Sequence, residues 1–287
     1  MIKRIKDSLQ VLLGRKEAIY LTQDKNKEPN FNREVFSVEE KAYIDNTSME
    51  FIFAEFGENR VNAGGADLSG HSRLDPTLSS LKKYFPKATY TVYTDFDLKI
   101  EGVQTKRVVS PVKNEENHTR FGHRTSVYFR FLGLLESEAD FKCSIDTDMY
   151  ITSEDIIALV TLTQKFGFCV PHNVRQLLRQ DMKMSLDTRE ITDKSRGMGY
   201  SYNQSPMTLW KDDIRGQIFY KRASELMKAE PARGSYIMWK AAWDTGVYPY
   251  VLPRQFCVCV GEEGCGEEVL LHVGHPPVEK YYKEYLK

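Results

Sequence analysis

The sequence predicts a single α/β domain built on a mixed, mainly parallel β-sheet with helices on both faces. From Met49 onward, short runs of β-branched and aromatic residues alternate with longer amphipathic stretches, which is the pattern of strands alternating with helices. The chain has 287 residues, of which 41% are hydrophobic, enough to bury one full core. Sheets of this class bind ligands at the carboxyl ends of their strands.

The strands are predicted from short apolar runs that are rich in β-branched and aromatic residues and end in polar turns. In chain order they cover residues 51–56, 89–94, 106–109, 141–145, 166–170 and 251–260. The second strand ends at Asp95 and the fourth at Asp146, so both carboxylates are expected at the ligand-binding edge of the sheet.

The helices are predicted from apolar residues that recur at three- and four-residue intervals. They cover residues 76–84, 125–136, 153–160, 213–228 and 235–243. In the second of them Val127, Phe131 and Leu134 share one face, and the third begins at Ser153 as its N-cap. Arg130 lies on the same face as Val127 and Leu134, so its head group is expected to point toward the packed side of the helix.

The chain divides into residues 1–48, an N-terminal helix and polar connector, and residues 49–287, the α/β domain. Residues 22–48 show no periodicity and are expected to form a loose connector. Residues 172–200 are charged and lack periodicity, and are expected either to fold over a ligand as a lid or to be an ordinary charged excursion.

The charge balance and the lengths of the apolar runs exclude several classes of protein. Forty basic and forty acidic residues give zero formal charge, so no global field attracts nucleic acid. No apolar run reaches the ~18–20 residues of a membrane span, and the basic N-terminal helix lacks a cleavage pattern. That helix either lies on an anionic membrane surface or docks on the domain.

Five cysteines, an odd number, indicate a reducing and therefore cytoplasmic compartment. Cys257, Cys259 and Cys265 lack the C-x2-C pairs of familiar zinc sites and are expected to be free thiols.

The strongest chemical signal is the segment FKCSIDTDMYI, residues 141–151. Asp146 and Asp148 are two residues apart after a half-buried strand, so their side chains project to the same side. Converging carboxylates repel each other unless a cation lies between them, and oxygen ligands suit Mg²⁺ or Mn²⁺, which also holds a diphosphate. Two alternatives are a solvated turn and a haloacid-dehalogenase nucleophile, in which Tyr150 would stand where threonine is required.

The segment SVYFRFLGLLESEADFKCSIDTDMYI resembles GT-A glycosyltransferases, nearest to the retaining family that includes glycogenin and the lipooligosaccharide galactosyltransferases. The resemblance covers about residues 50–275 loosely. It implies a Rossmann-like GT-A domain in which Asp146 and Asp148 hold Mn²⁺ and the donor diphosphate. It also implies that Arg130 reaches the donor, with Asp95 at the same edge.

Two later segments extend this resemblance. In YSYNQSPMTLWKDD, Asn203 would contact the donor sugar, and Ser205 stands where the family has glycine. In LLHVGHPPVEKYY, His272 would complete the metal site, with His275 as the reserve. Lys280 would neutralise phosphate, although it is out of the family's register.

One departure concerns the reaction itself. Retaining enzymes of this type carry Gln or Glu at the start of a helix that here begins Arg233-Gly234-Ser235. An inverting enzyme needs a general base instead, and Glu230 and Asp244 are the carboxylates that flank this region. Retaining and inverting chemistry both stay open, and a solvated role stays open for each carboxylate.

The expected function is transfer of a sugar from a nucleotide-sugar, with a UDP-sugar favoured, to a glycan or lipid-linked acceptor with Mn²⁺ or Mg²⁺. A sugar-phosphate nucleotidyltransferase is an alternative, but FGENRVNAGGADLSGHSR lacks its compact glycine-rich loop. The missing helix-start Gln or Glu keeps a non-catalytic sugar-nucleotide-binding protein as a further alternative.

Overall fold

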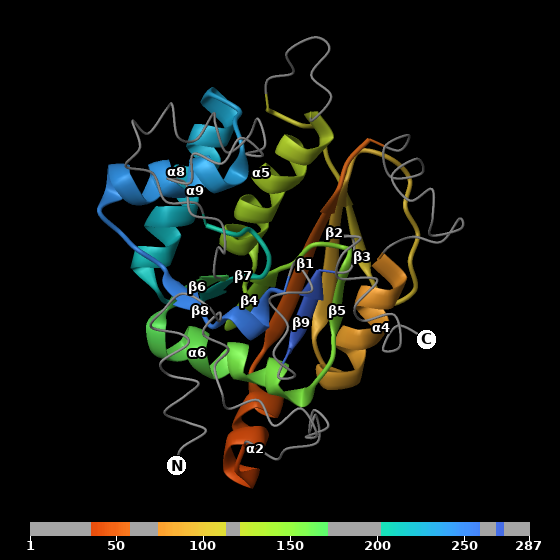
Figure 1. Ribbon diagram of the computed structural model, residues 1–287. Helices are drawn as coiled ribbons and strands as arrows, with labels where there is room; N and C mark the ends of the chain where they lie inside the picture. Colours follow the sequence, from red (N-terminus) through yellow and green to blue (C-terminus); the bar gives the residue numbers. More distant parts are fainter. Residues whose placement is uncertain (1–35, 58–73, 113–120, 172–201, 259–267, 273–287) are drawn as a thin grey trace, which may run out of the picture.

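The computed structural model describes residues 36–57, 74–112, 121–171, 202–258 and 268–272. In this part of the chain a central sheet carries helices on both faces (Figure 1). The strands of the main sheet are β1 (Met49–Glu55), β2 (Thr89–Thr94), β3 (Gln104–Arg107), β4 (Phe141–Ser144), β6 (Phe168–Pro171), β7 (Met207–Trp210) and β8 (Tyr250–Leu252).

The strand order across this sheet is β3-β2-β1-β4-β7-β6-β8. Within the described sheet β7 alone runs opposite to its neighbours, while the other pairs are parallel. The predicted α/β domain with a mixed, mainly parallel sheet is therefore confirmed. From β1 the chain moves outward through β2 and β3 and then returns to place β4 on the other side of β1. The carboxyl ends of β1 and β4 thus form a topological switch point, where sheets of this kind bind ligands.

The helices that the structure describes are α2 (Val38–Asn46), α4 (Leu74–Tyr84), α5 (Phe121–Glu136), α6 (Ala158–Phe166), α8 (Ile214–Ala229) and α9 (Gly234–Thr245). Two short 3₁₀ turns, η1 (Glu154–Ile157) and η2 (Arg254–Phe256), complete them. Helices α4 and α6 cover one face of the sheet, whereas α5, α8 and α9 gather on the other (Figure 1).

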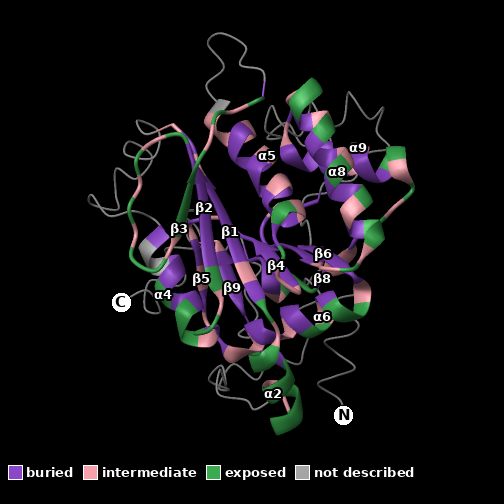
Figure 2. Cartoon of the chain, turned by 180° about the vertical axis from the view of Figure 1, so that it is seen from behind, coloured by how far each residue is buried: buried purple, intermediate pink, exposed green. Residues whose placement is uncertain are grey.

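Side-chain alternation along β1 divides the core between these two layers. Phe51 and Phe53 pack in the cluster under α4 and α6, while Ile52 and Ala54 pack in the cluster under α5, α8 and α9. Because successive side chains of a strand point to opposite faces, a strand covered on both sides reads as a continuous apolar run. The central strands are buried along their length in Figure 2.

A two-stranded antiparallel sheet lies beside the main one and consists of β5 (Met149–Ile151) and β9 (Leu270–His272). β5 follows the Asp146–Asp148 turn directly, and its last residue pairs with the first of β9. Neither strand was predicted, because three-residue strands are too short to show periodicity.

Three sequence predictions need correction. Residues 22–48 were expected to lack structure, but the last part forms α2, which opens on a capping box between Ser37 and Glu40. Ile44 of α2 is buried in the core. The strand predicted over 251–260 ends at Leu252, because Pro253 has no N–H for the sheet and a 3₁₀ turn follows.

The third correction concerns residues 153–170. The predicted helix start is right, since Ser153 caps η1, but the helix continues through α6 to Phe166. Gly167, with φ of 88°, ends it in a conformation that favours glycine, so the next strand begins at Phe168 rather than at residue 166.

Candidate functional site

The Asp146–Asp148 turn lies at the topological switch point. The backbone N–H of Ile145 donates to Ile52 O of β1 over 3.1 Å, so β4 stays paired with β1 up to the residue before Asp146. The chain then turns sharply into β5. Both carboxylates are partly exposed, with 28% of the Asp146 side chain and 18% of the Asp148 side chain accessible.

His272 reaches the same place through the pairing of β5 with β9. In this register His272 lies opposite Met149, the residue that follows Asp148. Its backbone N–H donates to Val258 O over 3.0 Å, which fixes the strand on its other edge. The imidazole Nε2 lies 3.0 Å from Asp148 Oδ1. Two segments far apart in sequence therefore converge because of one short antiparallel ladder.

Ligand atoms of Asp146, Asp148 and His272 lie within 4.8 Å of one another. Two carboxylate oxygens and one imidazole nitrogen form a donor set that suits Mn²⁺ or Mg²⁺, with further positions left for water or phosphate oxygen. The chemistry of this set fits a divalent cation. The prediction that these three residues come together is confirmed; the identity of an ion stays a proposal.

Arg130 of α5 contacts the turn and is only 2% exposed. Its Nη1 donates to Asp146 Oδ1, its Nη2 donates to the carbonyl of Gln204, and its Nε donates to Ser144 Oγ over 3.2 Å. The expectation that its head group points inward is confirmed. Burial of a guanidinium costs free energy unless its N–H groups are paired, and here each of its three nitrogens donates one hydrogen bond.

Two further side chains hydrogen-bond with the backbone of the turn, and a third contacts one of its side chains. Ser205 Oγ accepts the N–H of Asp146 over 2.8 Å. The hydroxyl of Thr77 in α4 lies 2.7 Å from Thr147 O and 2.6 Å from Met149 O. The Thr147 hydroxyl in turn donates to Glu55 at the end of β1. Ser205 thus contacts the Asp146–Asp148 turn itself through a hydroxyl, which glycine lacks.

Gln204 is a site residue that the sequence analysis missed. A Cβ on Gly234, the first residue of α9, would lie 2.3 Å from Gln204 Oε1, so the missing side chain of Gly234 makes room for Gln204. The Oε1 atom is buried without a hydrogen-bond partner among the described residues. The signal in the sequence was the glycine at the first position of α9, which leaves space that a neighbouring side chain can fill.

Asp95 and Asn203 lie nearby through different contacts. Asp95 Oδ1 accepts the backbone N–H of Gly57 over 2.9 Å, which ties the loop after β2 to the loop after β1 at the carboxyl edge. Asn203 Nδ2 donates to Cys257 Sγ over 3.3 Å, and Cys257 is a buried thiol. Donor contacts by Asp95 and Asn203 stay proposals.

The two candidate bases occupy different surroundings. Glu230 is exposed at the C-cap of α8. Asp244 of α9 accepts from Arg222 Nη2 over 2.7 Å and from Lys240. Partial burial raises the pKa of Asp244, but hydrogen bonds from Lys240 and Arg222 outweigh this effect and hold that pKa below its usual range. These contacts join α8 to α9, which is a structural role.

Several predicted residues lie outside the described part of the chain. They are the N-terminal helix, the proposed lid at 172–200, Cys259, Cys265, His275 and Lys280. Among the described residues no helix is both long and apolar enough to cross a membrane.

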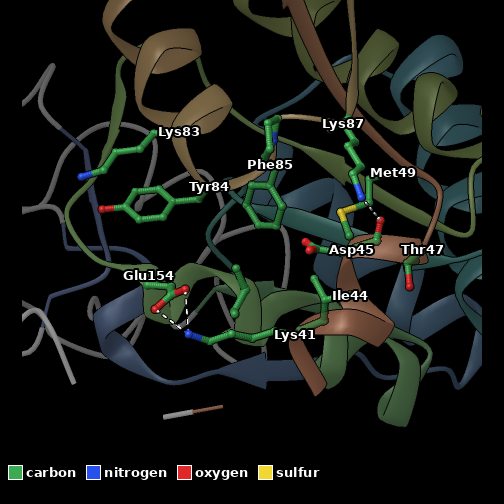
Figure 3. A pocket seen from close by; sticks show the side chains of 13 residues that line it. Lys41, Ile44, Asp45, Thr47, Met49, Lys83, Tyr84, Phe85, Lys87 and Glu154 are labelled. Atoms are coloured by element: carbon green, nitrogen blue, oxygen red, sulfur yellow. Dashed lines mark hydrogen bonds and ion pairs between the residues drawn. The ribbon is translucent and has the colours of Figure 1, made fainter. Parts of the chain in front are cut away.

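A pocket of about 180 Å³ lies at the opposite edge of the sheet, between α2, the end of α4 and η1 (Figure 3). Met49, the first residue of β1, and Ala88, just before β2, line it, so it opens at the amino ends of the strands. Lys41 and Glu154 pair across it at 3.1 Å. Since the Asp146 turn follows the carboxyl end of β4, this pocket is separate from the candidate site.

No protein-family profile and no curated protein sequence matches the chain. Similar solved structures include the galactosyltransferase LgtC in complex with donor and acceptor sugar analogs, 13% identical, with a TM-score of 0.47 over 73% of this chain and 75% of LgtC. The glycosyltransferase GlyE of Streptococcus pneumoniae TIGR4 is 10% identical, with a TM-score of 0.47 over 79% of this chain and 54% of GlyE.

A third similar structure is 4-diphosphocytidyl-2C-methyl-D-erythritol synthase from Anaerococcus prevotii DSM 20548, 13% identical, with a TM-score of 0.43 over 74% of this chain and 88% of the synthase. At these identities the similarity is one of fold.

Proposed function

We propose that this chain is a divalent-metal-dependent glycosyltransferase of the GT-A type, which moves a sugar from a nucleotide-sugar to a glycan or lipid-linked acceptor. The observation that carries the proposal is the group formed by Asp146, Asp148 and His272 at the switch point of the sheet. A nucleotide-sugar needs a site of this kind, where a diphosphate meets concentrated positive charge at the carboxyl ends of the strands.

A divalent cation held by Asp146, Asp148 and His272 would act as a Lewis acid toward the departing nucleoside diphosphate. The chain's own contribution is positioning. Arg130 Nη1 donates to the Asp146 carboxylate, and Ser205 Oγ accepts the backbone N–H of Asp146. Such pre-organised side chains lose little freedom when the donor binds.

The donor contacts of the proposal involve residues around this turn. Asn203 and Ser205 precede β7 and are proposed to face the donor sugar, with Asp95 at the edge toward the nucleotide. Lys280, outside the described residues, is proposed to reach the phosphates. A UDP-sugar is the proposed donor, and Glu230 and Asp244 stay the proposed bases if the reaction inverts.

The test is hydrolysis of UDP-glucose, UDP-galactose and UDP-N-acetylglucosamine by the full-length protein, with and without Mn²⁺. Hydrolysis needs no acceptor, so it reports the donor site alone. Asp148→Asn removes a metal ligand charge with little change in size and is expected to lower Mn²⁺-dependent turnover by at least about 10²-fold. Asp97→Asn is the matched control, because Asp97 is exposed and pairs only with Arg107 among its described contacts.

Wild-type turnover in the Asp148→Asn variant would remove the metal site from the proposal. Release of pyrophosphate from a sugar phosphate and a nucleoside triphosphate, without hydrolysis of any nucleotide-sugar, would identify a nucleotidyltransferase instead. Mn²⁺-dependent binding of a nucleotide-sugar without either reaction would identify a non-catalytic binding protein.

A further inference from the structure

The pocket at the amino ends of the strands has an apolar floor. Ile44 of α2, Met49 of β1, Phe85 and Ile157 of η1 line it, and all four are buried. Its volume of about 180 Å³ is close to the roughly 150 Å³ of an apolar cavity that binds benzene. The pocket therefore has room for one aromatic ring or one branched aliphatic group.

One end of this pocket carries a complete ion pair. Lys41 Nζ lies 3.1 Å from one carboxylate oxygen of Glu154 and 3.3 Å from the other, and the pair joins α2 to η1 (Figure 3). Each charge at this end already has its counterion.

The other end carries two opposite charges that are not paired with each other. Asp45 belongs to the last turn of α2, and Lys87 lies in the loop between α4 and β2. Lys87 Nζ donates to the backbone carbonyl of Asp45 over 3.4 Å, a long hydrogen bond, and no ion pair joins it to the Asp45 carboxylate (Figure 3). Neither group forms an ion pair with any other residue that the structure describes. A carboxylate and an ammonium group thus lie close together, and both are available to a ligand.

The position of Asp45 favours a cationic partner. The C-terminal end of a helix carries partial negative charge, which disfavours a carboxylate in the last turn. The last turn of α2 holds no basic residue that would offset Asp45. A bound ammonium group would offset both the carboxylate and the helix end.

We propose that this pocket binds a free α-amino acid with an apolar side chain. An α-amino acid carries an ammonium group and a carboxylate on one carbon, which matches the two unpaired groups at one end of the pocket. Its ammonium group contacts Asp45, its carboxylate contacts Lys87, and its side chain packs against Phe85 and the rest of the apolar floor. The proposal does not rest on the proposed function, because no residue of the Asp146–Asp148–His272 group lines the pocket.

A simple organic acid or a simple amine is the competing class of ligand. Lys83 also lines the pocket, but its Nζ lies 4.9 Å from the centre of the Tyr84 ring and points away from Asp45 and Lys87 (Figure 3). The open end therefore holds one charge of each sign. An acid bound at Lys87 would meet the like charge of Asp45, and an amine bound at Asp45 would meet that of Lys87, whereas an amino acid pairs with both.

The experiment is isothermal titration calorimetry of the full-length protein, without metal or nucleotide, against two matched series of probes. The first series is L-phenylalanine, 2-phenylethylamine and 3-phenylpropionate, and the second is L-leucine, 3-methylbutylamine and 4-methylpentanoate. Within each series the analogues lack either the carboxylate or the ammonium group and keep the rest of the skeleton. Probe concentrations reach about 10 mM, because ligands of this size have few atoms with which to offset the cost of binding.

The variants are Asp45→Asn and Lys87→Met, and their matched controls are Asp97→Asn and Lys221→Met. The control residues lie on other elements, Asp97 in the loop after β2 and Lys221 on α8. All four substitutions replace exposed side chains, so the thermal midpoint is expected to be unchanged.

At least one amino acid is expected to bind the wild type and both controls, and its two analogues to bind at least about tenfold more weakly, since each lacks one charge-assisted contact. Each pocket variant is expected to weaken binding of the amino acid by at least about tenfold. Asp45→Asn should not weaken binding of the acid, and Lys87→Met should not weaken binding of the amine, because those probes lack the group that the replaced side chain contacts. A general disturbance of the pocket would weaken all three probes.

The inference is overturned if neither amino acid binds, if an analogue binds as tightly as its amino acid, or if either pocket variant leaves amino-acid binding unchanged. These outcomes are distinguishable from failure of the proposed function. Asp148→Asn should leave amino-acid binding unchanged, and that binding should persist even if the chain hydrolyses no nucleotide-sugar. If the pocket binds no amino acid, Mn²⁺-dependent hydrolysis is unaffected.

Discussion

Arg130 shows how much of the candidate site depends on one buried charge. Its guanidinium contacts Ser144, Asp146 and the carbonyl of Gln204, so it joins β4, the Asp146–Asp148 turn and the loop before β7. Without it, a carboxylate and a carbonyl would lose their donor in a part-buried place. Removing one partner of such a pair lowers the free energy of unfolding by more than the intact pair contributes to it. The reason is that the remaining groups stay desolvated without a hydrogen-bond donor to compensate.

We therefore predict that Arg130→Met lowers the free energy of unfolding by about 2–3 kcal/mol, less than the loss for a fully buried pair because Asp146 is partly exposed. Urea denaturation measures this. Arg107→Met is the control, since Arg107 pairs with Asp97 while 65% of its side chain is exposed, and such pairs contribute about 0–1 kcal/mol. Equal effects of the two substitutions would show that Arg130 is not an organising contact.

Single residues also mark where sequence-based prediction succeeded and failed. The position of Arg130 was predictable, because a helical wheel places it between Val127 and Leu134. The role of Ser205 was not, because its contact with Asp146 joins residues 59 positions apart and leaves no periodic signal. Gln204 was missed for the same reason. Local patterns report a residue's own element, whereas long-range contacts depend on how elements pack.

At the scale of elements, the loop before β7 and the start of α9 fit together through one glycine. A Cβ at Gly234 would lie 2.3 Å from Gln204 Oε1 and 2.9 Å from Val127 Cγ1 of α5, both closer than real contacts allow. Alanine has the better helix propensity by up to about 1 kcal/mol. The clash therefore outweighs the gain in helix propensity, so replacement of Gly234 by alanine is expected to lower the free energy of unfolding. Glycine is needed here for space.

We predict that Gly234→Ala lowers the free energy of unfolding by about 1–3 kcal/mol through overpacking. In the double variant with Gln204→Ala, part of that loss should be recovered, because the clash with Oε1 is gone while the one with Val127 stays. Urea denaturation of the two single variants and the double variant gives the coupling energy. Losses that simply add would mean that Gln204 does not pack against Gly234.

Most elements of the main sheet and most helices were predictable, whereas β7 of the main sheet and the strands β5 and β9 were not. β1, β2 and α5 carry long runs with clear periodicity, and their predicted positions agree with the structure to within a few residues. β5 and β9 have three residues each and exist because they pair with each other. The candidate metal ligand His272 depends on that pairing for its position, so the sequence could suggest the histidine but not the contacts that bring it to Asp146 and Asp148.

At the scale of the whole molecule, the candidate site lies between two sheets and the helices around them. Asp146 and Asp148 follow a strand of the main sheet, His272 ends a strand of the small one, and Arg130 comes from α5. The strand–helix alternation predicted the fold class, but the strand order, with its return from β3 to β4 across β1, could not be read from it. A ligand that bridges these elements should therefore stabilise the folded chain as a unit.

We predict that Mn²⁺ together with UDP raises the thermal midpoint of the full-length protein. At a ligand concentration 100 times its Kd, stabilisation by mass action is about 2.7 kcal/mol, which corresponds to roughly 5–10 °C for a chain of this size. Differential scanning fluorimetry measures the shift, with Mn²⁺ alone and UDP alone as references. Because the cation and the diphosphate are proposed to share one site, the combined shift should exceed the sum of the separate ones. Asp148→Asn should abolish that excess, and the control Asp97→Asn should keep it. A shift that survives Asp148→Asn would place the nucleotide away from the Asp146–Asp148–His272 group.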